Sequence, residues 1–138
     1  MDATRALRVM LVEDHAAFRQ ALARLLAYEL DLEMVAQAGS LAEAREALEG
    51  GLEGRLDVAM LDLALPDGDG RELIGELRRN NPGISIVVLS ASIETGHFEE
   101  ILRASGADAV LDKVASPSTI AHEVRRLRSA DEPPPSTY

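Results

Sequence analysis

Polar side chains follow four of the apolar runs in this sequence, at the points where buried strands would end. They are Glu13, Asp14, Asp62, Ser90 and Lys113. Clustered carboxylates repel one another unless they share a hard cation, and Mg²⁺ prefers oxygen ligands. A carboxylate in such a group can act as a nucleophile toward phosphorus, while an ammonium neutralises charge on the transferring phosphoryl group. These residue types favour phosphoryl-transfer chemistry, provided that the fold brings them together.

Five short apolar runs alternate with five segments of helical pattern. The runs predict strands at residues 8–12, 34–38, 58–61, 84–89 and 109–111, and the intervening segments predict helices at 16–30, 40–48, 69–79, 95–105 and 117–128. This alternation predicts an α/β fold, a doubly wound parallel (βα)5 sheet with helices on both faces. Parallel strands bring their carboxyl ends to one edge, where open α/β sheets bind ligands. The polar residues are therefore expected to share that edge.

Finer patterns predict helix ends and faces. Ser40 with Glu43 matches a capping box, and Ser116 before Pro117 is a typical helix start. Apolar spacings of three and four predict that the first helix buries a stripe of Phe18, Leu22, Leu25 and Leu26. A basic run near the end of the last helix is interpreted as a solvated face, with a partner contact as the alternative; it consists of Arg125, Arg126 and Arg128.

Composition limits the classes of protein that remain. The 138 residues suit one domain, expected to span residues 1–129, with residues 130–138 as a disordered tail or the start of a linker. The chain has no cysteine, a net charge of −10 and 3% aromatic residues, which argues against thiolate metal sites and direct nucleic-acid binding. We find no membrane-spanning run and no signal peptide pattern, so we expect a cytoplasmic protein without membrane contacts.

The joint spacing of these motifs resembles the receiver domain of two-component response regulators, the CheY-like family. The resemblance rests on the Glu13-Asp14 pair, Asp62 with the Leu-Pro-Asp-Gly turn that follows, Ser90-Ala91 and Lys113, and it covers about residues 7–129. Glu13-Asp14-His15 followed by Phe18-Arg19 is most similar to the NarL/FixJ class. The resemblance implies a flavodoxin-like sheet with strand order 2-1-3-4-5.

The resemblance also implies a role for each polar residue. Asp62 would accept a phosphoryl group from a sensor histidine kinase, and the chain would catalyse only its own phosphotransfer and dephosphorylation. Mg²⁺ would be bound by Asp14, Asp62 and the main-chain carbonyl of Ala64, with Glu13 acting through a metal-bound water. Lys113 would pair with a phosphate oxygen.

Ser90 would carry the change to a switch face formed by the fourth helix, fifth strand and fifth helix. That face, or alternatively the first and fifth helices, would form a homodimer. Transcriptional control is the expected output, since regulators of this class usually carry a helix-turn-helix domain after a linker. Such a linker would begin at Pro133-Pro134-Pro135.

Two positions depart from the family pattern. Val114 replaces the usual proline after the lysine, and because a non-proline cis bond costs about 2.5–4 kcal/mol, we expect a trans bond there. Val110 replaces the aromatic switch residue, so Ser90 either acts alone or the signal leaves by another route. Ala64 and Ser92 are small and should leave the phosphoryl group open to water, which predicts a short-lived phosphorylated form.

Other functions fit the residues less well. A phosphohydrolase of the haloacid dehalogenase type needs a second aspartate at the position of Ala64. The Asp67-Gly68-Asp69-Gly70 run lacks the spacing and closing glutamate of an EF-hand, and His15, His97 and His122 are too dispersed for a metal site. A receiver-like module that interacts without phosphorylation remains the main alternative, favoured by Val110 and Val114.

Overall fold

The computed structural model describes residues 6–50, 52, 55–91 and 97–130. All five predicted strands and all five predicted helices are present, together with a short hairpin that was not predicted. In chain order the elements are β1 (Leu7–Val12), α1 (Ala16–Leu26), β2 (Leu32–Ala38), α2 (Leu41–Glu49), β3 (Val58–Leu61), β4 (Ala64–Leu65), β5 (Gly68–Asp69), α3 (Gly70–Asn80), β6 (Ser85–Ser90), α4 (His97–Ser105), β7 (Ala109–Asp112) and α5 (Pro117–Ala130).

The long strands form a five-stranded parallel sheet in the order β2-β1-β3-β6-β7. With the β4–β5 hairpin set aside, this is the predicted order 2-1-3-4-5, so the flavodoxin-like expectation is confirmed. The central strand β3 lies between β1 and β6, and Met60 is paired with Leu11 on one side and Val87 on the other. All four residues of β3 are buried, as expected of a strand covered on both faces.

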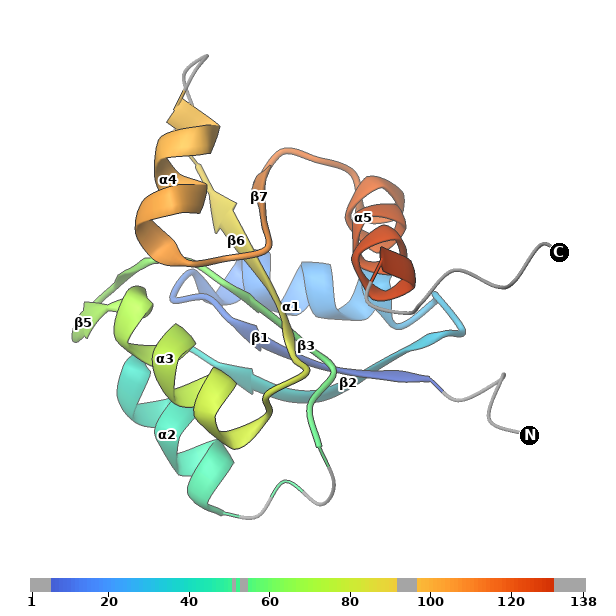
Figure 1. Ribbon diagram of the computed structural model, residues 1–138. Coiled ribbons are helices and arrows are strands. Elements are labelled where there is room, and N and C mark those ends of the chain that lie inside the picture. The colour runs from blue at the N-terminus through green and yellow to red at the C-terminus, as the bar shows by residue number, and fades with distance from the viewer. Residues whose placement is uncertain (1–5, 51, 53–54, 92–96, 131–138) are drawn as a thin grey trace, which may run out of the picture.

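Helices cover both faces of the sheet, and each face has its own apolar core (Figure 1). Val58 and Met60 of β3 belong to the core beneath α1 and α5, whereas Ala59 and Leu61 belong to the core beneath α2, α3 and α4. This two-residue alternation is the side-chain period of a β-strand. Packing on both faces, together with its pairing to β1 and β6, holds β3 at the centre of the sheet.

Both predicted helix caps are confirmed by hydrogen bonds, and Asp69, where the third helix was expected to start, supplies another cap. Ser40 Oγ accepts from the Glu43 backbone N–H at 3.0 Å, and Ser116 Oγ accepts from that of Thr119 at 3.1 Å. Asp69 Oδ1 accepts from the backbone N–H of Arg71 at 2.9 Å, at the first turn of α3. Each cap satisfies a donor that has no partner within its helix.

The first helix is shorter than predicted, and its apolar stripe is narrower. It ends at Leu26 rather than residue 30, because the backbone N–H groups of Tyr28 and Glu29 turn back to the carbonyls of Leu25 and Leu26. Leu25 was predicted to be buried, but it is 47% exposed. The chain beyond the helix must reverse at once, because β2 already begins at residue 32.

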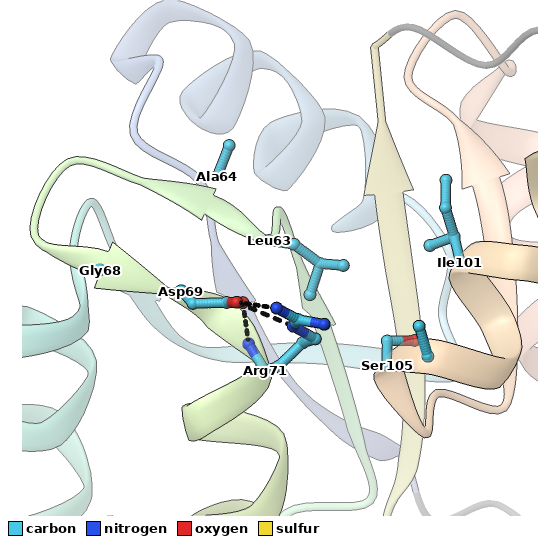
Figure 2. Close-up of a pocket in the computed structure, with 8 residues that line it drawn as sticks. Leu63, Ala64, Gly68, Asp69, Arg71, Ile101 and Ser105 are labelled. Carbon is cyan, nitrogen blue, oxygen red and sulfur yellow. Dashed lines mark hydrogen bonds and ion pairs between the residues drawn. The ribbon is translucent and has the colours of Figure 1, made fainter.

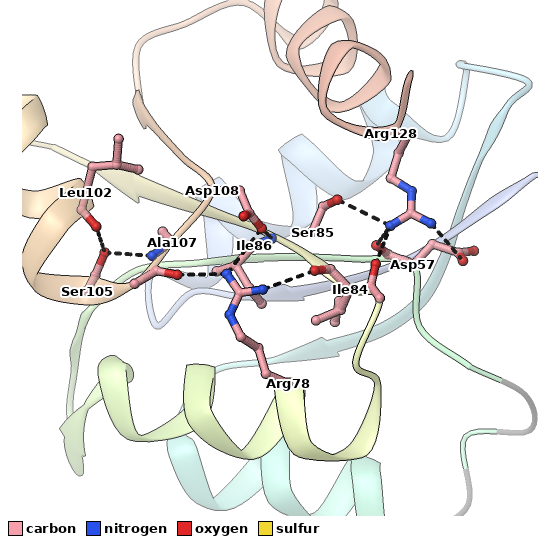
Figure 3. Close-up of polar contacts among 12 residues, drawn as sticks. Asp57, Arg78, Ile84, Ser85, Ile86, Leu102, Ser105, Ala107, Asp108 and Arg128 are labelled. Carbon is pink, nitrogen blue, oxygen red and sulfur yellow. Dashed lines mark hydrogen bonds and ion pairs between the residues drawn. The ribbon is translucent and has the colours of Figure 1, made fainter. Parts of the chain in front are cut away.

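The basic run of α5 is not the solvated face that was predicted. Arg125 binds Glu29 and Asp31 at distances of 2.5–2.8 Å, which ties α5 to the α1–β2 turn. Arg128 donates to the carbonyls of Asp57 and Gly83 at the amino edge of the sheet (Figure 3). Two of the three arginines therefore anchor the last helix to distant parts of the chain.

A second set of contacts joins α3 to the segments that lead into β6 and β7 (Figure 3). Arg78 donates to the carbonyls of Ile84 and Gly106 and to the carboxylate of Asp108. Gly106 itself has a φ of +77°, the left-handed conformation that ends α4 where the sequence predicted. No helix of the described residues is long and apolar enough to cross a membrane. The last helix extends to Ala130, the first residue of the predicted tail, whereas residues 131–138 and Ser92 lie outside the described residues.

Candidate functional site

Three acidic residues meet where β1 and β3 end side by side. Val12 is paired with Leu61 in the sheet, so Glu13 and Asp14 leave β1 next to the point where Asp62 leaves β3. Each of the three residues offers a carboxylate oxygen, and these oxygens lie within 4.8 Å of one another. Glu13 is buried, Asp62 is half-buried and Asp14 is exposed. The sheet edge therefore gathers the acids that the sequence placed there.

The ammonium of Lys113 completes this group. Its Nζ lies 2.7 Å from Asp62 Oδ2 and 2.6 Å from Glu13 Oε1. The backbone N–H of Lys113 also donates to the carbonyl of Ser90 at 3.0 Å, which holds the residue beside the end of β6. Burial by itself would lower the pKa of Lys113, but its contacts with the carboxylates of Asp62 and Glu13 outweigh that effect and raise the pKa. Lys113 is therefore a fixed cation.

Glu13 is the most constrained member of the group. Its side chain is fully buried, and Oε2 accepts from the backbone N–H of His15 at 2.9 Å. Oε1 has no hydrogen bond of good geometry among the described residues, so its 2.6 Å contact with Lys113 is an ion pair with poor angles. A buried carboxylate oxygen with an incomplete set of donors is unusual, and a cation or its water shell would satisfy it.

The donor set fits a hard divalent cation. Three carboxylates stand against one ammonium, which leaves an excess of negative charge that a cation would offset. All the side-chain ligands are oxygens, the type that Mg²⁺ and Ca²⁺ prefer. The composition of this acidic cluster therefore suits a divalent cation such as Mg²⁺.

The loop after Asp62 is held in place by short-range contacts. The backbone N–H of Ala64 donates to Asp62 Oδ1 at 2.9 Å. Gly70 packs so closely behind the loop that a Cβ there would lie 2.7 Å from the Asp62 carbonyl oxygen and 2.9 Å from Leu63 Cα. Only glycine allows this approach, because both contacts are with backbone.

The β4–β5 hairpin extends this loop and is fastened to α2. Asp67 at its tip accepts hydrogen bonds from the backbone N–H groups of Leu41 and Ala42, at 2.8 and 2.9 Å. These two bonds lower the pKa of Asp67. The acidic Asp67–Gly70 run thus caps a helix and shapes a turn.

The remaining predicted site residues lie nearby with fewer contacts. Ser90 ends β6 next to Asp112 of β7, and its carbonyl accepts from Lys113. Val114 follows Lys113 through the predicted trans peptide bond and is 86% exposed. His15 accepts from the Phe18 N–H as the N-cap of α1, whereas His97 and His122 are exposed on α4 and α5. No histidine joins the acidic group.

An apolar groove runs beside the site without including its charged atoms (Figure 2). Leu63 and Ala64 of the loop line one side, and Ile101 and Ser105 of α4 line the other. Arg71 and Asp69, which form an ion pair, also line it. The groove and the acidic group are thus two separate features on adjoining parts of the surface.

Two residues near the site were missed by sequence reasoning. Phe18 was assigned to a buried stripe and, with Arg19, to the class resemblance, but not to the site; Lys113 Nζ lies 5.5 Å from the centre of its ring. Arg19 donates to the Glu13 carbonyl at 2.6 Å and so holds the turn between β1 and α1. Neither contact has a local signal in the sequence, because each depends on how α1 is packed against the sheet.

Comparisons with known proteins agree with this geometry. The protein-family model for the response regulator receiver domain matches residues 9–125 of this chain. The transcriptional regulatory protein UhpA of Salmonella typhimurium is 38% identical over 120 residues, which cover 86% of this chain and 57% of UhpA. The chain thus spans a little over half the length of the curated relatives it matches.

Two solved structures are also similar. CheY6 of R. sphaeroides, solved in complex with the P1 domain of CheA3, is 28% identical with a TM-score of 0.76, covering 91% of this chain and 98% of that one. The receiver domain of the putative response regulator NarL from Mycobacterium tuberculosis is 26% identical with a TM-score of 0.72, covering 92% and 97%. The chain belongs to the response regulator receiver domains, of the NarL-like class.

Proposed function

We propose that this domain accepts a phosphoryl group on Asp62 from the phosphohistidine of a sensor histidine kinase in the cytoplasm. An oxygen of the Asp62 carboxylate attacks phosphorus, the phosphorus–nitrogen bond breaks, and the imidazole leaves with the bonding electrons. The observation that carries the proposal is the position of Lys113 Nζ, 2.7 Å from Asp62 Oδ2. A fixed ammonium at that distance neutralises charge as the phosphoryl group arrives.

The acidic group would hold Mg²⁺ during this reaction. Asp14, Asp62 and the main-chain carbonyl of Ala64 would bind the ion directly, and buried Glu13 would act through a water. The ion supplies positive charge that draws the carboxylates and the phosphoryl oxygens together. Support comes from the 4.8 Å grouping of the acids and from the incompletely bonded Oε1 of Glu13.

The attached phosphoryl group would then change the carboxyl edge of the sheet. Lys113 would pair with one of its oxygens, and the Ser90 hydroxyl would donate to another. Because Ser90 lies beside Asp112 at the end of β7, a shift of Ser90 reaches the surface of α4, β7 and α5. That surface, or the one formed by α1 and α5, would pair two copies of the domain and so control transcription, as the name of the relative UhpA suggests.

Phosphorylation by a small donor tests this proposal. Wild-type protein incubated with acetyl phosphate and Mg²⁺ should gain one phosphoryl group in intact-mass measurements. The Asp62→Asn variant should gain none, while Asp69→Asn, which removes another acid of the same loop, should behave as wild type. An unmodified wild-type mass, or a modified Asp62→Asn variant, would refute the assignment.

A module that interacts without phosphorylation is the second candidate. It is favoured by Val110, which replaces the aromatic switch residue, and by the exposed Val114. In either case the domain acts on no separate substrate. Magnesium affinity separates the two candidates, because a site that has lost phosphorylation should gain no thermal stability from Mg²⁺.

A further inference from the structure

The aromatic ring of Phe18 lies against the ammonium of Lys113. The 5.5 Å between Nζ and the ring centre is within the range of about 6 Å in which a cation is attracted to an aromatic ring. The same nitrogen makes the ion pairs with Glu13 and Asp62, and the Lys113 side chain is only 16% exposed. Two carboxylates and one ring therefore surround the ammonium.

Contacts of both the backbone and the side chain hold Phe18 in place. Phe18 lies in the first turn of α1, where its backbone N–H donates to His15 Nδ1 at 3.3 Å. The backbone N–H of Arg19 donates to the His15 carbonyl at 2.9 Å, which closes the same turn. The Phe18 side chain also packs on the core beneath α1 and α5. The hydrogen bonds fix the backbone that carries the ring, and packing on the core holds the ring on the side of Lys113.

We propose that Phe18 is a positioning residue for the phosphoryl-transfer reaction, acting through Lys113. Lysine has a flexible stem and a strongly hydrated head, so it adopts many orientations when nothing encloses it. The ring restricts these orientations and keeps Nζ directed at Asp62, where the new charge appears. The inference rests on the proposed function, because its effect is on the rate at which Asp62 is phosphorylated.

Substitutions at Phe18 separate the ring from simple packing. Phe18→Leu keeps an apolar side chain on the core but removes the aromatic face, whereas Phe18→Tyr keeps both. A control one helical turn away is Leu22→Ala, since Leu22 is buried in the same core and is not one of the groups that bind Lys113. This control should lose stability and keep the reaction rate, measured below its melting temperature.

Two measurements on these variants test the proposal. With acetyl phosphate and saturating Mg²⁺, Phe18→Leu should be phosphorylated about fivefold more slowly than wild type, and Phe18→Tyr should retain the wild-type rate. By NMR, the ε-methylene protons of Lys113 should show a ring-current shift that disappears in Phe18→Leu and persists in Phe18→Tyr.

The outcomes distinguish this inference from the proposed function. A Phe18→Leu variant with the wild-type rate would overturn the positioning role, as would a Phe18→Tyr variant as slow as Phe18→Leu. Absence of any ring-current shift in wild type would overturn the contact itself. Wild-type protein that takes up no phosphoryl group would instead refute the proposed function, and with it the positioning role, whatever the NMR result.

Discussion

Replacing Lys113 with methionine tests how strongly the acidic group depends on its cation. Methionine keeps a long apolar side chain but removes the ammonium, so Glu13 and Asp62 each lose a contact shorter than 3 Å. Glu13 has no exposed surface, so water cannot take the place of the lost ammonium. Without a metal ion, the variant must either keep an unpaired carboxylate in the interior or protonate it.

The size of the effect follows from these two options. Removing one partner of a buried ion pair costs about 3–5 kcal/mol, and the partial exposure of Asp62 reduces this. Protonating a glutamate at pH 7 costs about 4 kcal/mol, which sets an upper limit. We therefore expect Lys113→Met to lower the free energy of unfolding by about 2–4 kcal/mol at pH 7 in a chelating buffer.

The pH dependence adds a second signature. The pKa of Lys113 is raised in the folded state, so its stabilising effect is complete below the unfolded value and disappears as the pH rises through the folded value. The difference between the two proteins should therefore shrink at strongly alkaline pH.

Urea denaturation with and without Mg²⁺ measures this prediction. Mg²⁺ should restore more stability to Lys113→Met than it adds to wild type, because the ion replaces the missing positive charge. Arg71→Met is a matched control, since it removes a cation from the exposed Asp69 pair in the neighbouring loop and should change stability far less. A Lys113→Met variant as stable as wild type at pH 7, with no response to Mg²⁺, would contradict this reasoning.

Three further substitutions test the scaffold around the site. Gly70→Ala should destabilise the protein by about 1–3 kcal/mol in urea titrations and slow phosphorylation, because its Cβ would collide with the Asp62 carbonyl. An unchanged urea midpoint would argue against the close approach of Gly70 to the Asp62 loop. Asp67→Ala should lower the thermal midpoint most above pH 5 and progressively less as the pH falls, because the lowered pKa of Asp67 stabilises the fold above its unfolded value and this gain is lost as pH falls through the folded value. A pH-independent loss would contradict that linkage. Arg128→Met should lower the free energy of unfolding by about 1–3 kcal/mol, because the Asp57 carbonyl loses a hydrogen bond. The phosphorylation rate should stay unchanged, and a slower reaction would show that α5 and the site are coupled.

The sequence was sufficient to predict the sheet and the grouping of acids. Apolar runs that end in a charged or hydroxyl residue encode both the strand and its carboxyl end, so Asp62 and Lys113 were predicted at the same edge although 51 positions separate them. Helix caps were equally readable, because a side chain such as Ser40 binds a backbone group only three residues away. Both signals are local.

What the sequence missed depends on contacts between distant segments. Leu25 was wrongly predicted to be buried, and α1 was wrongly predicted to continue beyond Leu26. Helical spacing in the sequence continues past the point where the chain must turn into β2. Arg125 binds residues more than 90 positions away, so its role was invisible in a basic run. The contact between Phe18 and Lys113 arises for the same reason.

The central claim is that Asp62 forms an acyl phosphate, and chemical trapping tests it most directly. Protein phosphorylated with acetyl phosphate and Mg²⁺ should be reduced with borohydride, which converts an acyl phosphate to an alcohol, and then mapped by peptide mass spectrometry. We predict reduction at position 62, and none there in protein that was never exposed to the donor. Reduction at another acid, such as Asp14 or Asp69, or at no residue, would contradict the account.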